Sequence, residues 1–207
     1  MKIGGFQPLT LCDFPYISAA IVFTQGCNYR CPFCHNGSLL NMQVPEIQLL
    51  DAGNILDTLK TRKTILDGLV ISGGEPTIQE MLLPFIKQVR NIGYKIKLDT
   101  NGSHPDVIAK LLSENVLDYI AMDIKAPMEK YNLLSSVEVN IEDILHSIEI
   151  IKSAEITSEF RTTYIPDLLT ERDIESIRSL IPSNIKYTIQ EFIPENAWNW
   201  PVKQKYF

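Results

Sequence analysis

Three cysteines lie within eight positions near the start of the chain, at Cys27, Cys31 and Cys34. Three thiolates on so short a segment can converge on one metal centre, because thiolate sulfur suits zinc and iron–sulfur clusters. The segment directly follows an apolar, β-branched run, residues 19–24, which predicts a strand. We therefore expect metal or redox chemistry at the carboxyl end of that strand.

Several uses of these cysteines compete. The run from Cys31 to His35 matches the attachment pattern of haem c, but that chemistry takes place outside the cytosol. We expect no export signal, because residues 1–5 lead to no apolar region. Cys31 and Cys34 also match a glutaredoxin-type dithiol, which leaves Cys27 unused in a chain too long for a thioredoxin-like unit. A zinc site of three cysteines and His35 would need the adjacent side chains of Cys34 and His35 to converge.

A four-iron cluster held by all three cysteines is the reading we favour, and it leaves one iron without a protein ligand. An open coordination position on a metal is where a substrate or cofactor binds. The fourth cysteine, Cys12, lies in a separate segment before the first predicted strand. We expect Cys12 to be a small hydrophobic residue of the core rather than a fourth ligand.

Polar and glycine-rich segments follow three further predicted strands. Gly73 and Gly74 end one strand, where missing side chains let a ligand approach the backbone closely. Residues 99–102 end the next strand, and residues 122–125 end the one after it. Taken singly these are a turn and a solvated ion pair. Their repeated position at strand ends predicts a ligand site, because the carboxyl ends of parallel strands gather the loops that bind ligands.

The elements that must position these residues alternate along the chain. Strands are predicted at residues 19–24, 68–72, 95–98, 119–122, 159–164 and 185–190. Between them, apolar residues at helical spacing predict helices around residues 49–59, 82–89, 107–112, 141–148 and 174–177. This alternation predicts an α/β fold with a parallel sheet and right-handed crossovers. Six strands are too few for a closed eight-fold barrel, which leaves a partial barrel or a doubly wound sheet.

Length and composition set the remaining bounds. The 207 residues suffice for a single domain with its own core. A net charge of −6 and a pI near 5.1 argue against partners such as nucleic acid or an anionic membrane surface. No run approaches the ~20 apolar residues of a membrane span. We expect a cytoplasmic protein, in which these cysteines do not form disulfides.

The cysteine spacing, with the aromatic Phe33 before the last cysteine, resembles the radical S-adenosylmethionine (SAM) superfamily. The resemblance implies a partial (β/α)6 TIM-type barrel at residues 18–192, between an N-terminal extension at 1–17 and a tail at 193–207. It also implies a [4Fe-4S] cluster on Cys27, Cys31 and Cys34, with SAM chelating the fourth iron and Phe33 beside its adenine.

The segments at the other strand ends resemble companion motifs of the same superfamily. Gly73, Gly74 and Glu75 match its Gly-Gly-Glu-Pro segment, which holds the amino group of SAM. The later segments resemble the glycyl-radical activating branch, in which they contact the ribose and carboxylate of SAM and can hold a monovalent cation. The residues implied are Asp99, Thr100, Asn101, Asp123 and Lys125, with Arg161, Thr162, Thr163, Gln190 and Phe192 completing the rim.

Residues 4–15, 23–27 and 34–37 resemble the family of anaerobic ribonucleoside-triphosphate reductase activating proteins. This implies reductive cleavage of SAM to a 5′-deoxyadenosyl radical, which makes a glycyl radical on a partner reductase. The electron donor would be of flavodoxin or ferredoxin type. Small carboxy-deazaguanine synthases share the same rim, so a small-molecule synthase stays an alternative. A non-enzymatic iron–sulfur or zinc protein is the alternative from another class.

The histidines and the end of the chain carry weaker signals. We expect His104 and His146 to be structural or solvated, and His35 to shape its loop rather than bind metal. Residues 198–207 mix aromatic side chains with Lys203 and Lys205. This tail would form either a docking surface or a cover for the open edge of the barrel.

Overall fold

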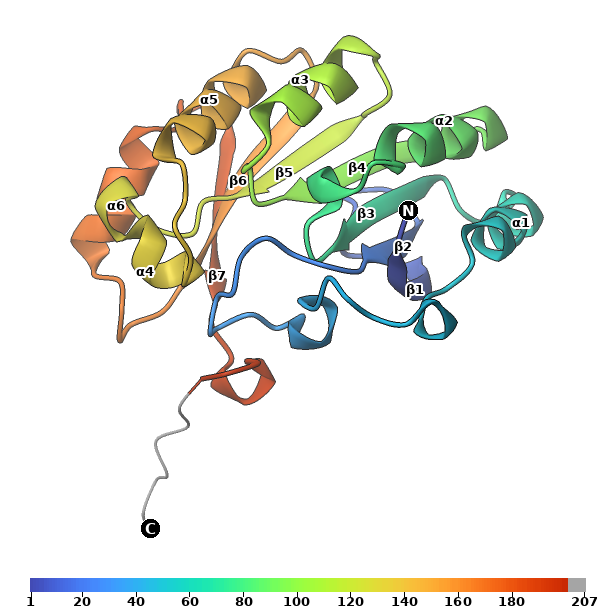
Figure 1. Cartoon of the computed structure of the whole chain (residues 1–207). Coiled ribbons are helices and arrows are strands. Elements are labelled where there is room, and N and C mark those ends of the chain that lie inside the picture. Colours follow the sequence, from blue (N-terminus) through green and yellow to red (C-terminus); the bar gives the residue numbers. More distant parts are fainter. Residues whose placement is uncertain (201–207) are drawn as a thin grey trace.

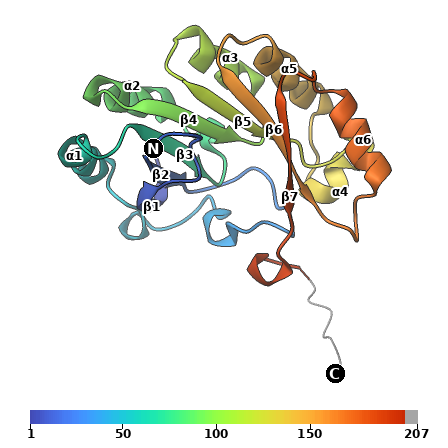
Figure 2. The same cartoon turned by 180° about the vertical axis from the view of Figure 1, so that it is seen from behind.

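The computed structural model describes residues 1–200, which form one seven-stranded sheet with the helices along one side of it (Figures 1 and 2). The strands are β1 (Ile3–Thr10), β2 (Ala19–Thr24), β3 (Gly68–Gly73), β4 (Lys95–Thr100), β5 (Tyr119–Asp123), β6 (Thr157–Tyr164) and β7 (Lys186–Glu191). The helices are α1 (Ala52–Arg62), α2 (Leu82–Ile92), α3 (Pro105–Ser113), α4 (Tyr131–Ser135), α5 (Ile141–Lys152) and α6 (Glu171–Ser179). None of these helices is long and apolar enough to cross a membrane.

The strands follow one another in the sheet in sequence order, from β1 to β7. The pairs from β2 to β7 are parallel, whereas β1 pairs with β2 in the antiparallel direction. A doubly wound sheet would reverse its strand order at a switch point, so the sequential order settles that alternative in favour of the partial barrel. The sheet is open, because β1 and β7 form its two edges.

The six predicted strands are confirmed with ends shifted by at most two residues. The strand β1 was not predicted. Residues 1–17 were expected to be an extension outside the barrel, but β1 within them belongs to the sheet, where Ile3 lies opposite Thr24 and Thr10 opposite Ala19. Its sequence hides it, because Gly4, Gly5 and Pro8 interrupt the alternation typical of a strand. The short α4 was not predicted either. The division of the chain at residues 17 and 192 stays a prediction.

The two faces of the sheet are packed differently. The larger apolar core lies between the helices and the outward residues of the strands, such as Leu69, Ile71 and Ile120. The inner face has only a small apolar cluster: Phe14, Ala19, Ile21, Val70, Tyr119 and Ala121. Further along the same inner face, charged residues replace apolar ones. The open barrel is thus apolar near the amino ends of its strands and polar at their carboxyl ends.

Local signals fix where the helices begin. Asp51 caps α1 by accepting from the backbone of Asn54 at 2.8 Å. At α6, Thr170 and Asp173 form a capping box in which each side chain accepts from the other's backbone. Asp173 also pairs with Lys130 at 2.6 Å, which ties α6 to the segment before α4. These contacts fix the first turns of α1 and α6.

Candidate active site

A cavity of about 430 Å³ opens at the carboxyl ends of the parallel strands. The thirteen residues predicted above as metal ligands or as the main cofactor contacts all line this cavity. These residues are Cys27, Cys31, Phe33, Cys34, Gly73, Gly74, Glu75, Asp99, Thr100, Asn101, Asp123, Lys125 and Arg161. Segments from five successive strand ends therefore meet at one place, as the rule for parallel sheets requires.

The three cysteines lie on an irregular loop that follows β2, and all three border the cavity. Cys27 and Cys31 are buried, and Cys34 is half-buried. Cys12 is exposed, so the expectation of a core residue was wrong. It lies in the bend after β1, where its sulfur is 3.5 Å from the carboxylate of Asp13, and it does not border the cavity.

The chemistry of the loop suits a metal centre of more than one ion. Burial raises the pKa of Cys27 to about 12 and that of Cys31 to about 11, so metal binding must displace a proton from each thiol. Within residues 1–200, no three His, Cys, Asp or Glu side chains are arranged to hold a single ion. His35 instead stacks on Phe192, with ring centroids 6.0 Å apart. The described residues thus form no three-cysteine, one-histidine zinc site, while three separate thiols fit a cluster in which each binds its own iron.

The two glycines at the end of β3 are required by close packing of backbone. A Cβ on Gly74 would lie 2.0 Å from the carbonyl oxygen of Gly26, directly before the cysteine loop. A Cβ on Gly73 would lie 2.3 Å from the backbone nitrogen of Thr24, and Gly73 has a positive φ of 118°. The glycine segment is therefore held against the start of the cysteine loop, with its backbone facing the cavity.

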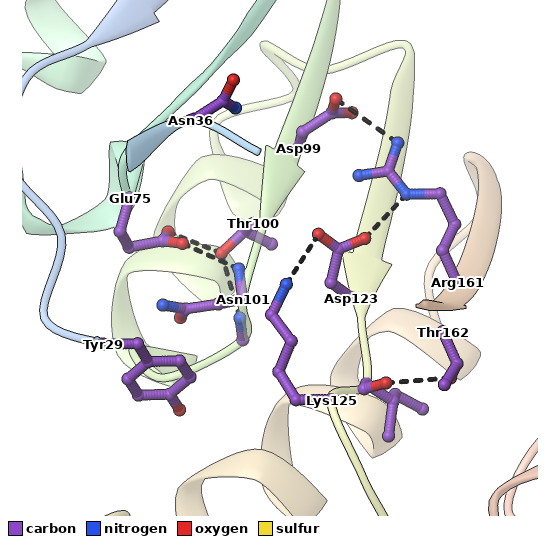
Figure 3. A network of polar contacts seen from close by, with 12 residues as sticks. Tyr29, Asn36, Glu75, Asp99, Thr100, Asn101, Asp123, Lys125, Arg161 and Thr162 are labelled. Carbon is purple, nitrogen blue, oxygen red and sulfur yellow. Dashed lines mark hydrogen bonds and ion pairs between the residues drawn. The ribbon is translucent and has the colours of Figure 1, made fainter. Parts of the chain in front are cut away.

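Glu75 is buried and its carboxylate is fully used within the protein (Figure 3). Its Oε1 accepts from the backbone of Thr77 at 3.0 Å and from the hydroxyls of Thr77 and Thr100 at 2.6 and 2.7 Å. Its Oε2 accepts from the backbone N–H of Asn101 at 2.7 Å. Burial raises the pKa of Glu75, and these hydrogen bonds oppose that rise. Glu75 thus joins the ends of β3 and β4, and a direct contact of its side chain with a ligand stays a prediction.

A row of charged side chains crosses the inner face from β4 to β6 (Figure 3). Arg161 bridges two carboxylates, at 2.8 Å to Asp123 and 3.4 Å to Asp99. Lys125 lies 3.1 Å from the other oxygen of Asp123. Burial alone would raise the pKa of Asp123, but the charges of Arg161 and Lys125 outweigh it and hold that pKa well below its ordinary value. The carboxylate is therefore ionised at neutral pH.

Lys97 belongs to the same row and was not among the predicted site residues. Its ammonium pairs with Asp99 and lies 5.6 Å from the ring centroid of Tyr119, while the side chain is only 2% exposed. The signal was present, because Lys97 and Asp99 are two residues apart on one strand and so share a face. In this row the basic side chains of Lys97, Lys125 and Arg161 alternate with Asp99 and Asp123. Lys125 and Arg161 border the cavity, so they can attract an anionic group of a ligand.

Two residues expected at the rim lie elsewhere. Thr162 is buried on the other face of β6, where its hydroxyl donates to the carbonyl of Ile124 at 2.8 Å (Figure 3). Side chains alternate along a strand, so only Arg161 and Thr163 of this run can face the cavity. Phe192 does not border the cavity but packs on the cysteine loop. Gln190 lines the cavity as expected.

Residues 192–200, which we call the C-terminal segment, cover the outside of the cysteine loop. The backbone N–H groups of Trp198 and Asn199 donate to the carbonyls of Cys34 and Pro32 at 2.9 and 3.1 Å. Phe192 packs edge-on against Phe33 and stacks on His35, and the loop-shaping role of His35 stays a prediction. Lys203, Lys205 and the rest of the predicted docking tail from residue 201 onward lie outside the described residues.

Further residues at the cavity gave no sequence signal. Tyr29 lies between two of the cysteines with its hydroxyl buried and without a hydrogen-bond partner in the described part of the chain. Asp13 reaches the cavity from the bend before β2 and accepts from the hydroxyl of Thr10.

His104, expected to be structural, has its Nδ1 2.9 Å from the hydroxyl of Ser103. His146 is exposed on α5.

Comparison with known proteins connects this site to an enzyme family. A family model described as the radical SAM superfamily matches residues 21–181. The chain is 32% identical over 207 residues to a putative glycyl-radical enzyme activating enzyme of Methanocaldococcus jannaschii, covering 98% of this chain and 84% of the relative. It is also 32% identical over 129 residues to the pyruvate formate-lyase-activating enzyme of Clostridium pasteurianum, covering 60% of this chain and 52% of that protein. In fold it is similar to the crystal structure of Streptococcus suis SuiB bound to precursor peptide SuiA, with a TM-score of 0.70 at 14% identity, over 90% of this chain and 41% of that one.

Proposed function

The chain belongs to the radical SAM superfamily, and we propose that it cleaves SAM reductively in this cavity to generate a glycyl radical on a partner enzyme. The observation that carries the proposal is the meeting of three cysteine thiols with four other strand ends around one cavity. Such a site can hold a cluster and a charged cofactor side by side, away from bulk water.

Cys27, Cys31 and Cys34 would hold a [4Fe-4S] cluster. Such a cluster supplies one electron to SAM, which breaks a carbon–sulfur bond and leaves methionine and a 5′-deoxyadenosyl radical. The protein contributes the position of the reactants. The packing of Gly73 and Gly74 against the cysteine loop supports this role, because it keeps the backbone that would bind SAM at a fixed distance from the thiols.

The charged row would bind the carboxylate of SAM. Lys125 and Arg161 border the cavity and complement that group, and the charge of Lys125 opposes the rise that burial gives to the pKa of Cys31. Asp99, Thr100 and Asn101 would lie along the ribose, and Phe33 would lie beside the adenine. Glu75 would act by holding these segments together rather than through a free carboxylate, since its oxygens already accept four hydrogen bonds.

Asp99 and Asp123 are the carboxylates of the charged row that could hold a monovalent cation at this rim. Each of these carboxylates already pairs with two basic side chains. We therefore propose that a cation binds only if one of these ion pairs opens. Replacing potassium by choline at constant ionic strength should then leave SAM cleavage unchanged, and a cleavage that requires potassium would show that the cation is part of the site.

The partner would be a glycyl-radical enzyme, such as an anaerobic ribonucleoside-triphosphate reductase. The names of the relatives support this class, and an open sheet, whose edge strands β1 and β7 are not paired with each other, is compatible with a protein substrate. The 5′-deoxyadenosyl radical would take one hydrogen atom from a glycine Cα of the partner, which yields 5′-deoxyadenosine and a glycyl radical. A flavodoxin or ferredoxin would supply the electron.

The test uses the anaerobically reconstituted protein, dithionite, SAM and a glycyl-radical enzyme encoded in the same genome. We expect a glycyl radical in the electron paramagnetic resonance (EPR) spectrum, with one 5′-deoxyadenosine formed per radical. The variant Cys31→Ala is the control and should give neither product. Formation of 5′-deoxyadenosine without a radical on any partner would reject the activating function and favour a small-molecule substrate.

A further inference from the structure

Two side-chain hydrogen bonds join the cysteine loop to the segment that follows β4. The carbonyl oxygen of the Asn28 side chain accepts from the side-chain amide of Asn101 at 2.9 Å. The Asn28 side-chain amide donates to the hydroxyl of Ser103 at 2.8 Å. Asn28 directly follows Cys27, and its two partners lie 73 and 75 positions further along the chain. One amide thus links two distant strand ends through both of its polar atoms.

The far side of this link is itself fixed. The backbone N–H of Asn101 donates to Glu75 at 2.7 Å, and its side-chain oxygen accepts from the backbone of Ser103 at 3.0 Å. Asn101 is buried, and so is Glu75. Both polar atoms of the Asn101 side chain are therefore occupied within the protein. Asn28 is held against a rigid base that already joins the ends of β3 and β4.

The cysteine loop needs such a link because it has no regular secondary structure of its own. Backbone bonds hold its beginning, where Cys27 donates to Leu40 at 3.3 Å, and its middle, where Arg30 donates to Ser135 at 2.8 Å. Neither bond connects the loop to β4. Two bonds to one planar amide fix a position and an orientation, and in a partly buried place they are stronger than in water.

We propose that Asn28, Asn101 and Ser103 form a latch that sets the position of the cysteine loop relative to the cofactor-binding ends of β3 and β4. Asn28 is a positioning residue in this proposal, since it acts through the neighbouring Cys27 and touches neither cofactor nor substrate. The latch would keep the open iron and SAM in register. The inference rests on the superfamily assignment and does not depend on the identity of the partner enzyme.

The first experiment measures SAM cleavage by the reconstituted holoprotein, without any partner. Removal of two hydrogen bonds in Asn28→Ala should raise the KM for SAM about tenfold, with iron content per chain unchanged. Asn41→Ala is the matched control, because this asparagine is exposed. In the described part of the chain, its side chain hydrogen-bonds only to the backbone N–H of the nearby Gln43. Its KM should equal that of the unmodified protein.

Two further variants separate positioning from direct binding. Ser103→Thr keeps the hydroxyl and should retain a low KM, whereas Ser103→Ala should raise it. The double variant of Asn28→Ala and Asn101→Ala should have a KM for SAM no higher than that of the more defective single variant, because both changes open the same latch. Additive effects would mean that Asn28 acts independently of Asn101 and would overturn the proposal.

Hydrogen exchange followed by mass spectrometry gives a readout that needs no cleavage of SAM. Asn28→Ala should speed exchange in residues 27–36 and leave β6 and α6 unchanged. An unchanged KM together with unchanged exchange would overturn the latch. Loss of iron in Asn28→Ala would overturn it as well, because Asn28 would then be needed to form the metal site rather than to align it.

Discussion

Arg161 and Asp123 lie opposite each other in register on β6 and β5, and the guanidinium Nε donates to Asp123 Oδ1 at 2.8 Å. The same guanidinium reaches Asp99 on β4, so one side chain spans three strands of the inner face. Burial alone would raise the pKa of Asp123, but the charges of Arg161 and Lys125 hold it well below its ordinary value, so this carboxylate stays ionised between two basic side chains. Charges of both signs are therefore in place at the cavity before a zwitterionic ligand arrives.

Arg161→Gln should raise the KM for SAM about tenfold or more, because the cavity loses one of the two basic side chains, Lys125 and Arg161, that can attract an anionic group. Iron content should stay unchanged, since Asp99 keeps Lys97 and Asp123 keeps Lys125 as partners. Initial rates of 5′-deoxyadenosine formation measure this. Arg178→Gln on α6, where the guanidinium lies 5.1 Å from the Tyr187 ring centroid, is the control. Equal KM values for the two variants would contradict the role given to the row.

Cys27→Ala, Cys31→Ala and Cys34→Ala should each abolish binding of the cluster. The loop offers only these three thiolates, and each would bind one iron. Cys12→Ala should keep it, since Cys12 is exposed and away from the cavity. Iron and sulfide analysis of the four reconstituted variants decides between them. Loss of iron in the Cys12 variant would show that the ligand set is wrong.

Gly37→Ala should displace the C-terminal segment from the cysteine loop. A Cβ at Gly37 would lie 2.4 Å from the Cβ of Trp198, closer than any contact allows. Both tryptophans of the chain, Trp198 and Trp200, belong to this segment, so tryptophan fluorescence, excited at a wavelength that tyrosine does not absorb, reports on it. We expect a red-shifted emission that is quenched more readily by iodide. Gly5→Ala, whose Cβ would meet Phe23 at an ordinary 3.4 Å, should leave the emission unchanged.

Asp173→Asn should lower the free energy of unfolding by about 1 kcal/mol at neutral pH, the usual value of a helix cap. The hydrogen bonds from Lys130 and from the backbone of Thr170 hold the pKa of Asp173 at about 2. A depressed pKa stabilises the fold above the unfolded value of about 3.9 and loses that effect as the pH falls toward 2. The difference between the two proteins in urea unfolding should thus be full above pH 5 and shrink below pH 4.

A matched variant tests whether this effect needs the cap. Asp57→Asn breaks an exposed ion pair with Lys60 on α1 and should change stability little at any pH. The role of Asp173 in the cap would be refuted if the loss of unfolding free energy in Asp173→Asn stayed constant down to pH 2.5. It would also be refuted if Asp57→Asn showed the same loss.

The sequence predicted most of the parallel sheet because its strands are short apolar runs bounded by glycine and polar residues. The site was predictable for a related reason: residues that follow parallel strands must gather at one edge. What it could not predict depends on partners distant in the chain. The strand β1 becomes regular only by pairing with β2, and the buried Lys97 is tolerated only because Asp99 and Tyr119 surround it.

The role of each residue in the site was harder to predict from the sequence than its presence there. Glu75 borders the cavity as predicted, but the sequence did not indicate that Thr77, Thr100 and Asn101 would hydrogen-bond to its carboxylate. A contact of its side chain with a ligand stays a prediction. Cys12 was expected in the core, yet the bend after β1 turns it outward. Both arrangements depend on tertiary contacts, which residue type alone does not give.

The most direct test of the account is the EPR spectrum of the anaerobically reconstituted, dithionite-reduced protein with and without SAM. We predict a [4Fe-4S] signal whose shape changes on addition of one equivalent of SAM, because one iron has no ligand from the protein. A spectrum that does not respond to SAM at any concentration would mean that the polypeptide ligates every iron, and it would contradict the central claim.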